Sequence, residues 1–89
     1  MPHYPEILYW YVTYCNAGIT DQRAVETFID CENRERVNTL RIQLYAVSQG
    51  KYDESVLLRQ LGRDRKDRYG SFQRWAKMML QWIAQYSRQ

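Results

Sequence analysis

The longest apolar segment of the chain covers residues 7–15 and reads Ile-Leu-Tyr-Trp-Tyr-Val-Thr-Tyr-Cys. The more polar positions in and around it, Glu6, Tyr9, Thr13 and Asn16, recur at intervals of three, four and three residues. On a helix these positions share one narrow wedge and leave an apolar face of roughly 220°. A surface helix needs an apolar stripe of only about 100°. The segment is therefore expected to be covered from two sides, by the rest of its own chain and by a candidate partner.

Local signals place this first helix at about residues 5 to 17. Pro5 suits the first helical position because the backbone N–H that proline lacks would have no intrahelical acceptor there, and Gly18 suits the left-handed residue that follows a helix. The segment is also rich in Tyr, Trp and Val, which favour strands. The alternative is an α+β fold with segments 7–15 and 39–47 as paired strands, because residues 40–46 alternate between apolar and more polar positions. The three-four-three spacing favours the helix.

A second helical region covers residues 21–49 and follows Thr20, a favourable N-cap residue. It carries two apolar stripes separated by an almost wholly polar stretch, residues 31–36. The stripes are Ala24, Val25, Phe28 and Ile29, then Val37, Leu40, Leu44 and Val47. On one straight helix they would differ by roughly 100° around the axis. The region is therefore either two helices broken near 32 to 35 or one long helix with a kink.

Two further helices are predicted in the C-terminal half. Asp53 caps a short helix over 54–61, and Ser71 caps a helix from residue 72 whose apolar residues step by three and four. The charged stretch between them, 63–70, is predicted to be a solvated linker. Eighty-nine residues make one domain. The prediction is an all-α fold, a compact bundle of four to five helices over 1–89, with a core drawn from the first and last helices and the 37–47 seam.

The aromatic content suggests contact surfaces. The chain has eight Tyr, three Trp and two Phe, which a small domain cannot easily hide. The candidate apolar contact residues are Tyr11, Tyr14, Trp75, Met78 and Trp82. The leading hypothesis is a small helical protein–protein interaction or regulatory module without catalytic activity, working as a homodimer or docked to a larger protein.

The charge distribution suggests an alternative. Residues 1–45 hold six acidic and four basic side chains, whereas residues 46–89 hold four acidic and nine basic ones, and the net charge is +3. Basic residues cluster between 59 and 77, next to Tyr69, Phe72 and Trp75. The candidate contacts for an anionic partner are Arg59, Arg63, Arg65, Lys66, Arg68, Arg74 and Lys77. Cations neutralise phosphates and aromatic rings stack on bases, so this region could form a nucleic-acid-binding module.

The chemistry of the remaining residues argues against an enzyme. The single histidine is His3, close to the N-terminus, and Cys15 and Cys31 form no CxxC motif. Cys15 is expected to stay protonated on the apolar face of the first helix, and no P-loop, GxGxxG, GxSxG or HExxH motif occurs. We expect no catalytic residue, metal or cofactor. The absence of a leader pattern and of a membrane-spanning run predicts a cytoplasmic protein.

Overall fold

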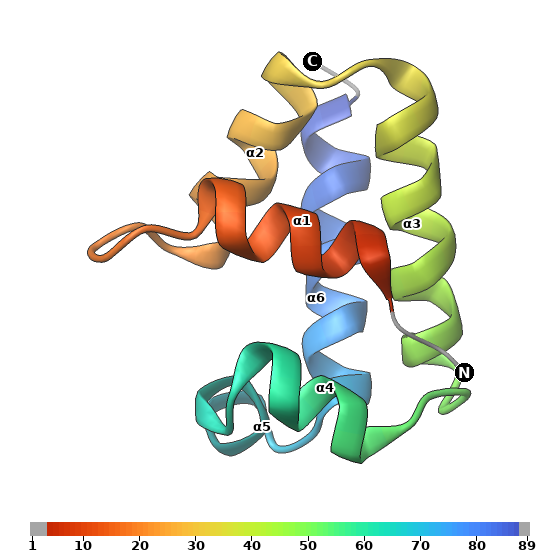
Figure 1. The fold of residues 1–89 in the computed structure, drawn as a ribbon. Coiled ribbons are helices and arrows are strands. Elements are labelled where there is room, and N and C mark those ends of the chain that lie inside the picture. Colours follow the sequence, from red (N-terminus) through yellow and green to blue (C-terminus); the bar gives the residue numbers. More distant parts are fainter. Residues whose placement is uncertain (1–3, 88–89) are drawn as a thin grey trace.

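The computed structural model describes residues 4–87, which form six α-helices and no strand (Figure 1). The helices are α1 (Pro5–Tyr14), α2 (Asp21–Cys31), α3 (Arg34–Ser48), α4 (Glu54–Leu61), α5 (Asp64–Tyr69) and α6 (Phe72–Ser87). The predicted all-α fold is confirmed. The α+β alternative is wrong for these residues, because both proposed strand segments fall mainly or wholly in helices. No helix within residues 4–87 is both long and apolar enough to cross a membrane.

The helix boundaries follow the capping residues. The side chains of Thr20, Asn33, Asp53 and Ser71 accept backbone N–H groups at the starts of α2, α3, α4 and α6. The sequence left open whether residues 21–49 form one kinked helix or two. They form two helices, separated by Glu32 and the capping residue Asn33. Each cap satisfies an N–H group that has no acceptor inside its helix.

Two features differ from the sequence prediction, the end of α1 and an additional helix. α1 ends at Tyr14 rather than near 17, because residues 16–19 form a turn in which the Ile19 N–H bonds to the Asn16 carbonyl at 3.0 Å. Gly18, at φ +85°, serves that turn instead of the helix end. The second difference is α5, which occupies most of the predicted linker 63–70. The linker prediction was therefore wrong, and α5 brings the total to six helices.

The helices are arranged around α6. In Figure 1, α3 and α6 run antiparallel side by side, α2 lies along another side of α6, and α1 crosses in front of it. α4 and α5 lie at the end where α6 begins. α1 contacts α2, α3 and α4. Its wide apolar face is therefore covered largely within the chain, without need of a partner.

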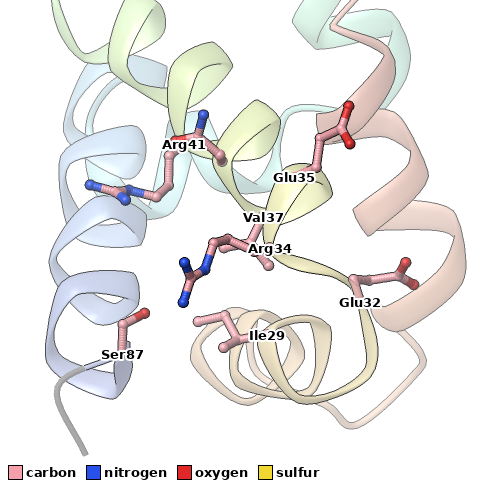
Figure 2. Close-up of a pocket in the computed structure, with 8 residues that line it drawn as sticks. Ile29, Glu32, Arg34, Glu35, Val37, Arg41 and Ser87 are labelled. Carbon is pink, nitrogen blue, oxygen red and sulfur yellow. The ribbon is translucent and has the colours of Figure 1, made fainter.

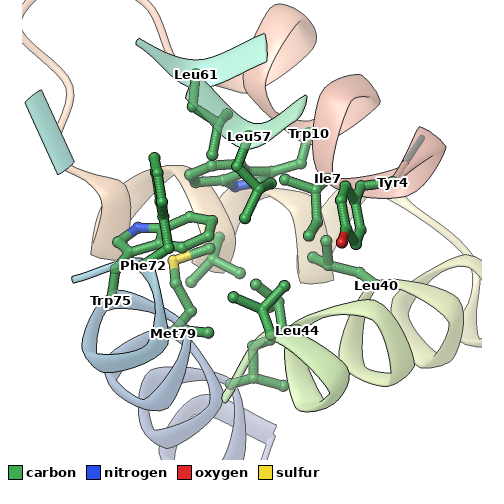
Figure 3. Close-up of a cluster of buried hydrophobic side chains, with 14 of the residues drawn as sticks. Tyr4, Ile7, Trp10, Leu40, Leu44, Leu57, Leu61, Phe72, Trp75 and Met79 are labelled. Atoms are coloured by element: carbon green, nitrogen blue, oxygen red, sulfur yellow. The ribbon is translucent and has the colours of Figure 1, made fainter. Parts of the chain in front are cut away.

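The buried side chains come from all the predicted core elements. Trp10 of α1, Leu57 of α4 and Met79 of α6 converge in the centre (Figure 3) and are each 0% exposed. From the predicted seam, Leu40 and Leu44 are equally buried, so the predicted core is confirmed.

The solvent exposure of α1 agrees only in part with its pattern of polar positions. Thr13 is exposed, as expected, but Tyr9 packs edge-on against Phe28, with ring centroids 6.2 Å apart. Glu6 is half-buried, and Val12 is exposed instead. The reason is that α2 and α3 lie against the side of α1 that the polar pattern assigned to solvent.

Candidate functional site

Arg65 is a buried structural residue and is therefore not available to an anionic partner. Its Nε and Nη2 donate to the two carboxylate oxygens of Asp21 at 2.8 and 2.7 Å. The Trp75 indole donates to the same carboxylate at 2.9 Å. Asp21 is 4% exposed and Arg65 7% exposed. This triad ties α2, α5 and α6 together, and a sequence pattern could not reveal it because the partners lie 44 and 54 residues from Asp21.

Three of the other six predicted basic contacts form ion pairs with nearby carboxylates. Lys66 pairs with Glu54 at 2.8 Å, Arg63 with Asp67 at 3.9 Å, and Arg68 with Asp64. Three members of the set are exposed and have no ion pair with a described residue: Arg59, Arg74 and Lys77. Of the three rings proposed for base stacking, Phe72 and Trp75 are 0% exposed, whereas Tyr69 is half-buried.

The predicted apolar contact residues are mostly used inside the fold. Trp75 is fully buried, which removes it from the set, while Tyr11, Tyr14, Met78 and Trp82 are half-buried. Tyr14 packs edge-on against Phe28 at 5.5 Å between ring centroids.

Glu32 is held at the junction of α1, α2 and α3. Its Oε2 accepts the hydroxyls of Tyr9, at 2.9 Å, and of Tyr14, and Arg36 lies 3.7 Å from its Oε1. The hydrogen bonds from Tyr14 and then Tyr9 lower the pKa of Glu32. Burial and the bond to Glu32 raise the pKa of Tyr14. The Glu32 carboxylate is therefore both hydrogen-bonded and ion-paired within the fold.

Beside Glu32 lies a hollow with a volume of about 760 Å³ (Figure 2). It is bounded by the end of α2, the first half of α3 and the end of α6. The lining residues are Ile29, Glu32, Arg34, Glu35, Val37, Asn38, Arg41 and Ser87. Ile29 and Val37 supply its apolar floor, and both are half-buried.

A second hollow of about 230 Å³ continues along the same helices. It shares Asn38 and Arg41 with the first and adds Ile42, Tyr45 and Leu80. We call the two hollows together the α3 groove. The side chains of Ile42 and Tyr45 are 61% and 60% exposed. The groove therefore has a solvent-exposed apolar rim beside its concave floor.

The charges of the α3 groove are arranged asymmetrically. Figure 2 shows the guanidinium groups of Arg34 and Arg41 reaching toward α6, whereas the carboxylates of Glu32 and Glu35 lie on the α1 side. Within residues 4–87, Arg34, Arg41 and Glu35 have no ion pair within 4.0 Å. The groove therefore offers two free cations on one flank and one free carboxylate on the other.

The Cys15 thiol is half-buried and lies outside the α3 groove. Burial and the nearby Asp21 charge raise the pKa of the Cys15 thiol to about 12, although Arg65 partly opposes them. Such a thiol is not a nucleophile at neutral pH. His3 lies outside the described residues. In the described part of the chain, no group of three or more His, Cys, Asp or Glu side chains is placed to hold a metal ion.

Comparisons with protein families, with curated proteins and with solved structures gave no match for this chain.

The α3 groove was missed in the sequence, although one signal was present. With the predicted seam at Val37, Leu40, Leu44 and Val47 turned toward the core, a helix turns Ile42 and Tyr45 away from it. The alternation of residues 40–46 was instead considered as a strand pattern. The remaining lining residues come from α2 and α6, and only the packing of three helices brings them together.

Proposed function

We propose that this protein is a protein–protein interaction module without catalytic activity, and that its partner binds along the α3 groove. The observation that carries the proposal is the exposed pair Ile42 and Tyr45 on the rim of the α3 groove, which also holds Arg34 and Arg41, neither with an ion pair to a described residue. Tyr and Arg are the residue types that most often dominate binding energy at protein interfaces.

The proposal depends on where Ile42 and Tyr45 lie, and not on how many apolar side chains are exposed. Single exposed apolar residues are normal on any protein, and Val12 and Ile19 are exposed near the α1–α2 connection. Ile42 and Tyr45 differ because they border a concave surface whose floor is also apolar. Full burial of such a side chain is worth about 1.5–3 kcal/mol. A partner seated in the groove could gain this from both residues at once.

The nucleic-acid alternative has less support from the geometry. Only Arg59, Arg74 and Lys77 of the basic set are exposed without an ion pair to a described residue, and the adjacent rings of Phe72 and Trp75 are buried. Non-specific affinity grows with the number of phosphates that free cations can neutralise. Three such cations, with the half-buried Tyr69 as the one partly exposed ring of the predicted set, favour weak binding.

The test is a selection of helical peptides from a displayed library on the wild-type protein, followed by affinity measurements on variants. Ile42→Lys and Tyr45→Lys place a charge on the groove rim. Val12→Lys is the matched control, because Val12 is 64% exposed but lies on α1 outside the groove. Circular dichroism and thermal unfolding verify that all three variants fold.

We expect the selected peptides to lose at least about tenfold in affinity for the two groove variants, or about 1.4 kcal/mol, and to bind Val12→Lys as they bind the wild type. Peptides that bind all four proteins equally, or a selection that yields no binder, would contradict the proposal.

A further inference from the structure

We infer that the occupant of the α3 groove is an amphipathic helix of a protein partner, with acidic residues on one flank and a basic residue on the other. This inference rests on the proposed function, because it concerns what binds in the same groove. It adds the conformation, length and charge pattern of the partner.

The groove favours a helix over an extended peptide. Its walls are side chains on three helices, and residues 4–87 contain no strand whose edge could pair with another backbone. An extended peptide buried there would leave its N–H and C=O groups short of partners, which is costly. A helix satisfies these groups internally and presents only side chains, as in other helix-in-groove complexes.

The dimensions set the length of the partner. The lining positions on α3 run from Arg34 to Tyr45, which at 1.5 Å per residue span about 16 Å. About three helical turns, or roughly eleven residues, cover this distance. α3 and α6 lie side by side along this length (Figure 1), so the helix of the partner would pack in the groove between them.

Arg34 and Arg41 predict acidic residues on one flank of the partner helix. Arg34 and Arg41 are seven residues apart, which places them two turns apart on the same face of α3, at a separation of about 10 Å along its axis. Both side chains reach toward α6 (Figure 2), and neither has an ion pair with a described residue. Carboxylates seven residues apart on the partner would match this spacing, and a guanidinium can bind each through two hydrogen bonds.

The opposite flank carries negative charge. Glu35 is exposed and has no ion pair within residues 4–87, and the Glu32 carboxylate lies on the same side (Figure 2). A basic residue on the second flank of the partner would face Glu35 and fix the rotation of the bound helix. The same carboxylate disfavours a nucleic-acid strand, whose phosphates it would repel.

The experiment uses three fluorescently labelled 14-residue peptides with identical apolar positions and one basic flank position. The first carries two Glu residues seven apart, the second Gln and the third Lys at those positions. Fluorescence anisotropy measures their affinity for the wild type and for two double variants. Arg34→Glu/Arg41→Glu reverses the charge of the groove flank. Arg74→Glu/Lys77→Glu makes the same change in net charge on the exposed face of α6.

We expect the Glu peptide to bind the wild type at least about tenfold more tightly than the Gln peptide, and the Lys peptide most weakly. In Arg34→Glu/Arg41→Glu this order should reverse, whereas the α6 control should keep it. Equal losses in both double variants would mean non-specific attraction and overturn the inference.

The remaining outcomes separate this inference from the proposed function. If the three peptides bind equally well and lose affinity for Ile42→Lys, or if only neutral or basic library peptides bind the groove, the charge pattern is wrong and the proposed function stands. If none of the three binds, the inference fails and the library selection alone decides the proposed function. Sedimentation of the protein alone adds one more outcome. A dimer that Ile42→Lys dissociates and Val12→Lys does not would make a second copy the occupant and overturn the inference.

Discussion

Arg65 holds the Asp21 carboxylate through both of its oxygens, with donor–acceptor distances of 2.8 and 2.7 Å. The pair is almost completely buried. Burial alone would lower the pKa of Arg65, but the hydrogen bonds and charge of Asp21 outweigh it and the net pKa is raised. The Arg65 guanidinium therefore remains charged in the interior, and the loss of either residue leaves the other buried without its ion-pair partner.

Replacement of one partner should be costly. Arg65→Met leaves the Asp21 charge with only the Trp75 indole, and we expect the free energy of unfolding to fall by about 3–5 kcal/mol. In Asp21→Asn/Arg65→Met the loss should be smaller than the sum of the single losses by about 2 kcal/mol. Urea denaturation of the four proteins measures this coupling. Additive losses would show that the pair contributes nothing beyond its separate contacts.

The two buried tryptophans should respond differently to the same substitution. Trp10 and Trp75 are both 0% exposed, but only the Trp75 indole donates to Asp21, whereas Trp10 Nε1 has no acceptor among the described residues. Trp75→Phe and Trp10→Phe remove similar volumes. We expect Trp75→Phe to cost about 1.5–3 kcal/mol more, the range for a hydrogen bond to a charged group. Equal losses in thermal unfolding would contradict the role of that bond.

Local signals in the sequence were sufficient for most of the fold. Caps such as Thr20 and Asp53 act on backbone groups two or three residues away, and the seam of α3 follows from helical periodicity. α5 could not be predicted in this way because its residues, Asp-Arg-Lys-Asp-Arg-Tyr, show no apolar stripe. What holds it is the bond from Arg65 to a carboxylate 44 residues earlier.

The candidate site was harder to predict for the same physical reason. Ile42 and Tyr45 could be recognised as exposed once the seam was assigned to a helix. The groove beside them also needs Ile29 from α2 and Leu80 from α6. A concave surface is a property of how helices pack, and no spacing within one helix encodes it. Charge clustering drew attention to 59–77, where ion pairs and burial engage most of the cations.

Glu32 should make the stability sensitive to acid. Its pKa in the folded protein lies below the ordinary value of 4.5 because Tyr14 and Tyr9 donate to it. Folding thus favours the ionised form. The corresponding stabilisation is present above pH 4.5 and is lost as the pH falls through the lower folded-state pKa.

We therefore expect Glu32→Gln to be less stable than the wild type at pH 7 and to lose less stability between about pH 5 and pH 3. Glu35→Gln is the control, because Glu35 is exposed and has no ion pair with a described residue. Thermal unfolding at a series of pH values measures the slopes. If Glu32→Gln keeps the acid slope of the wild type, the two tyrosine bonds are not responsible for it.

The two thiols should differ in reactivity. Cys31 is exposed, whereas Cys15 is half-buried with a pKa of about 12. At pH 8 only about one Cys15 thiol in 10⁴ is ionised, and the thiolate is the reactive form. We expect iodoacetamide to label one site rapidly, at Cys31, and Cys15 only in denaturant. Mass spectrometry of the labelled protein and of Cys31→Ser, which should remain unlabelled when folded, checks the assignment.

Oligonucleotide binding should be weak and confined to low salt. Arg59→Glu/Arg74→Glu/Lys77→Glu reverses the three cations that are free of ion pairs with described residues, and it should abolish the residual binding in fluorescence anisotropy without loss of helicity. Substitutions at Arg65 are unsuitable for this test, because Arg65→Glu would place a second carboxylate beside Asp21. Submicromolar binding at physiological salt would favour the nucleic-acid alternative.

The packing of Trp10 on Trp75, with ring centroids 6.0 Å apart, also constrains how the chain can fold during translation. The apolar segment 7–15 leaves the ribosome before α6, against which Trp10 packs and which is synthesised more than fifty residues later. Until then the nascent chain presents several large apolar side chains that its own sequence cannot yet cover, which is the state that chaperones recognise and that aggregation exploits. Yield in cells should therefore depend on the rate of elongation and on chaperone supply as much as on the stability of the finished fold.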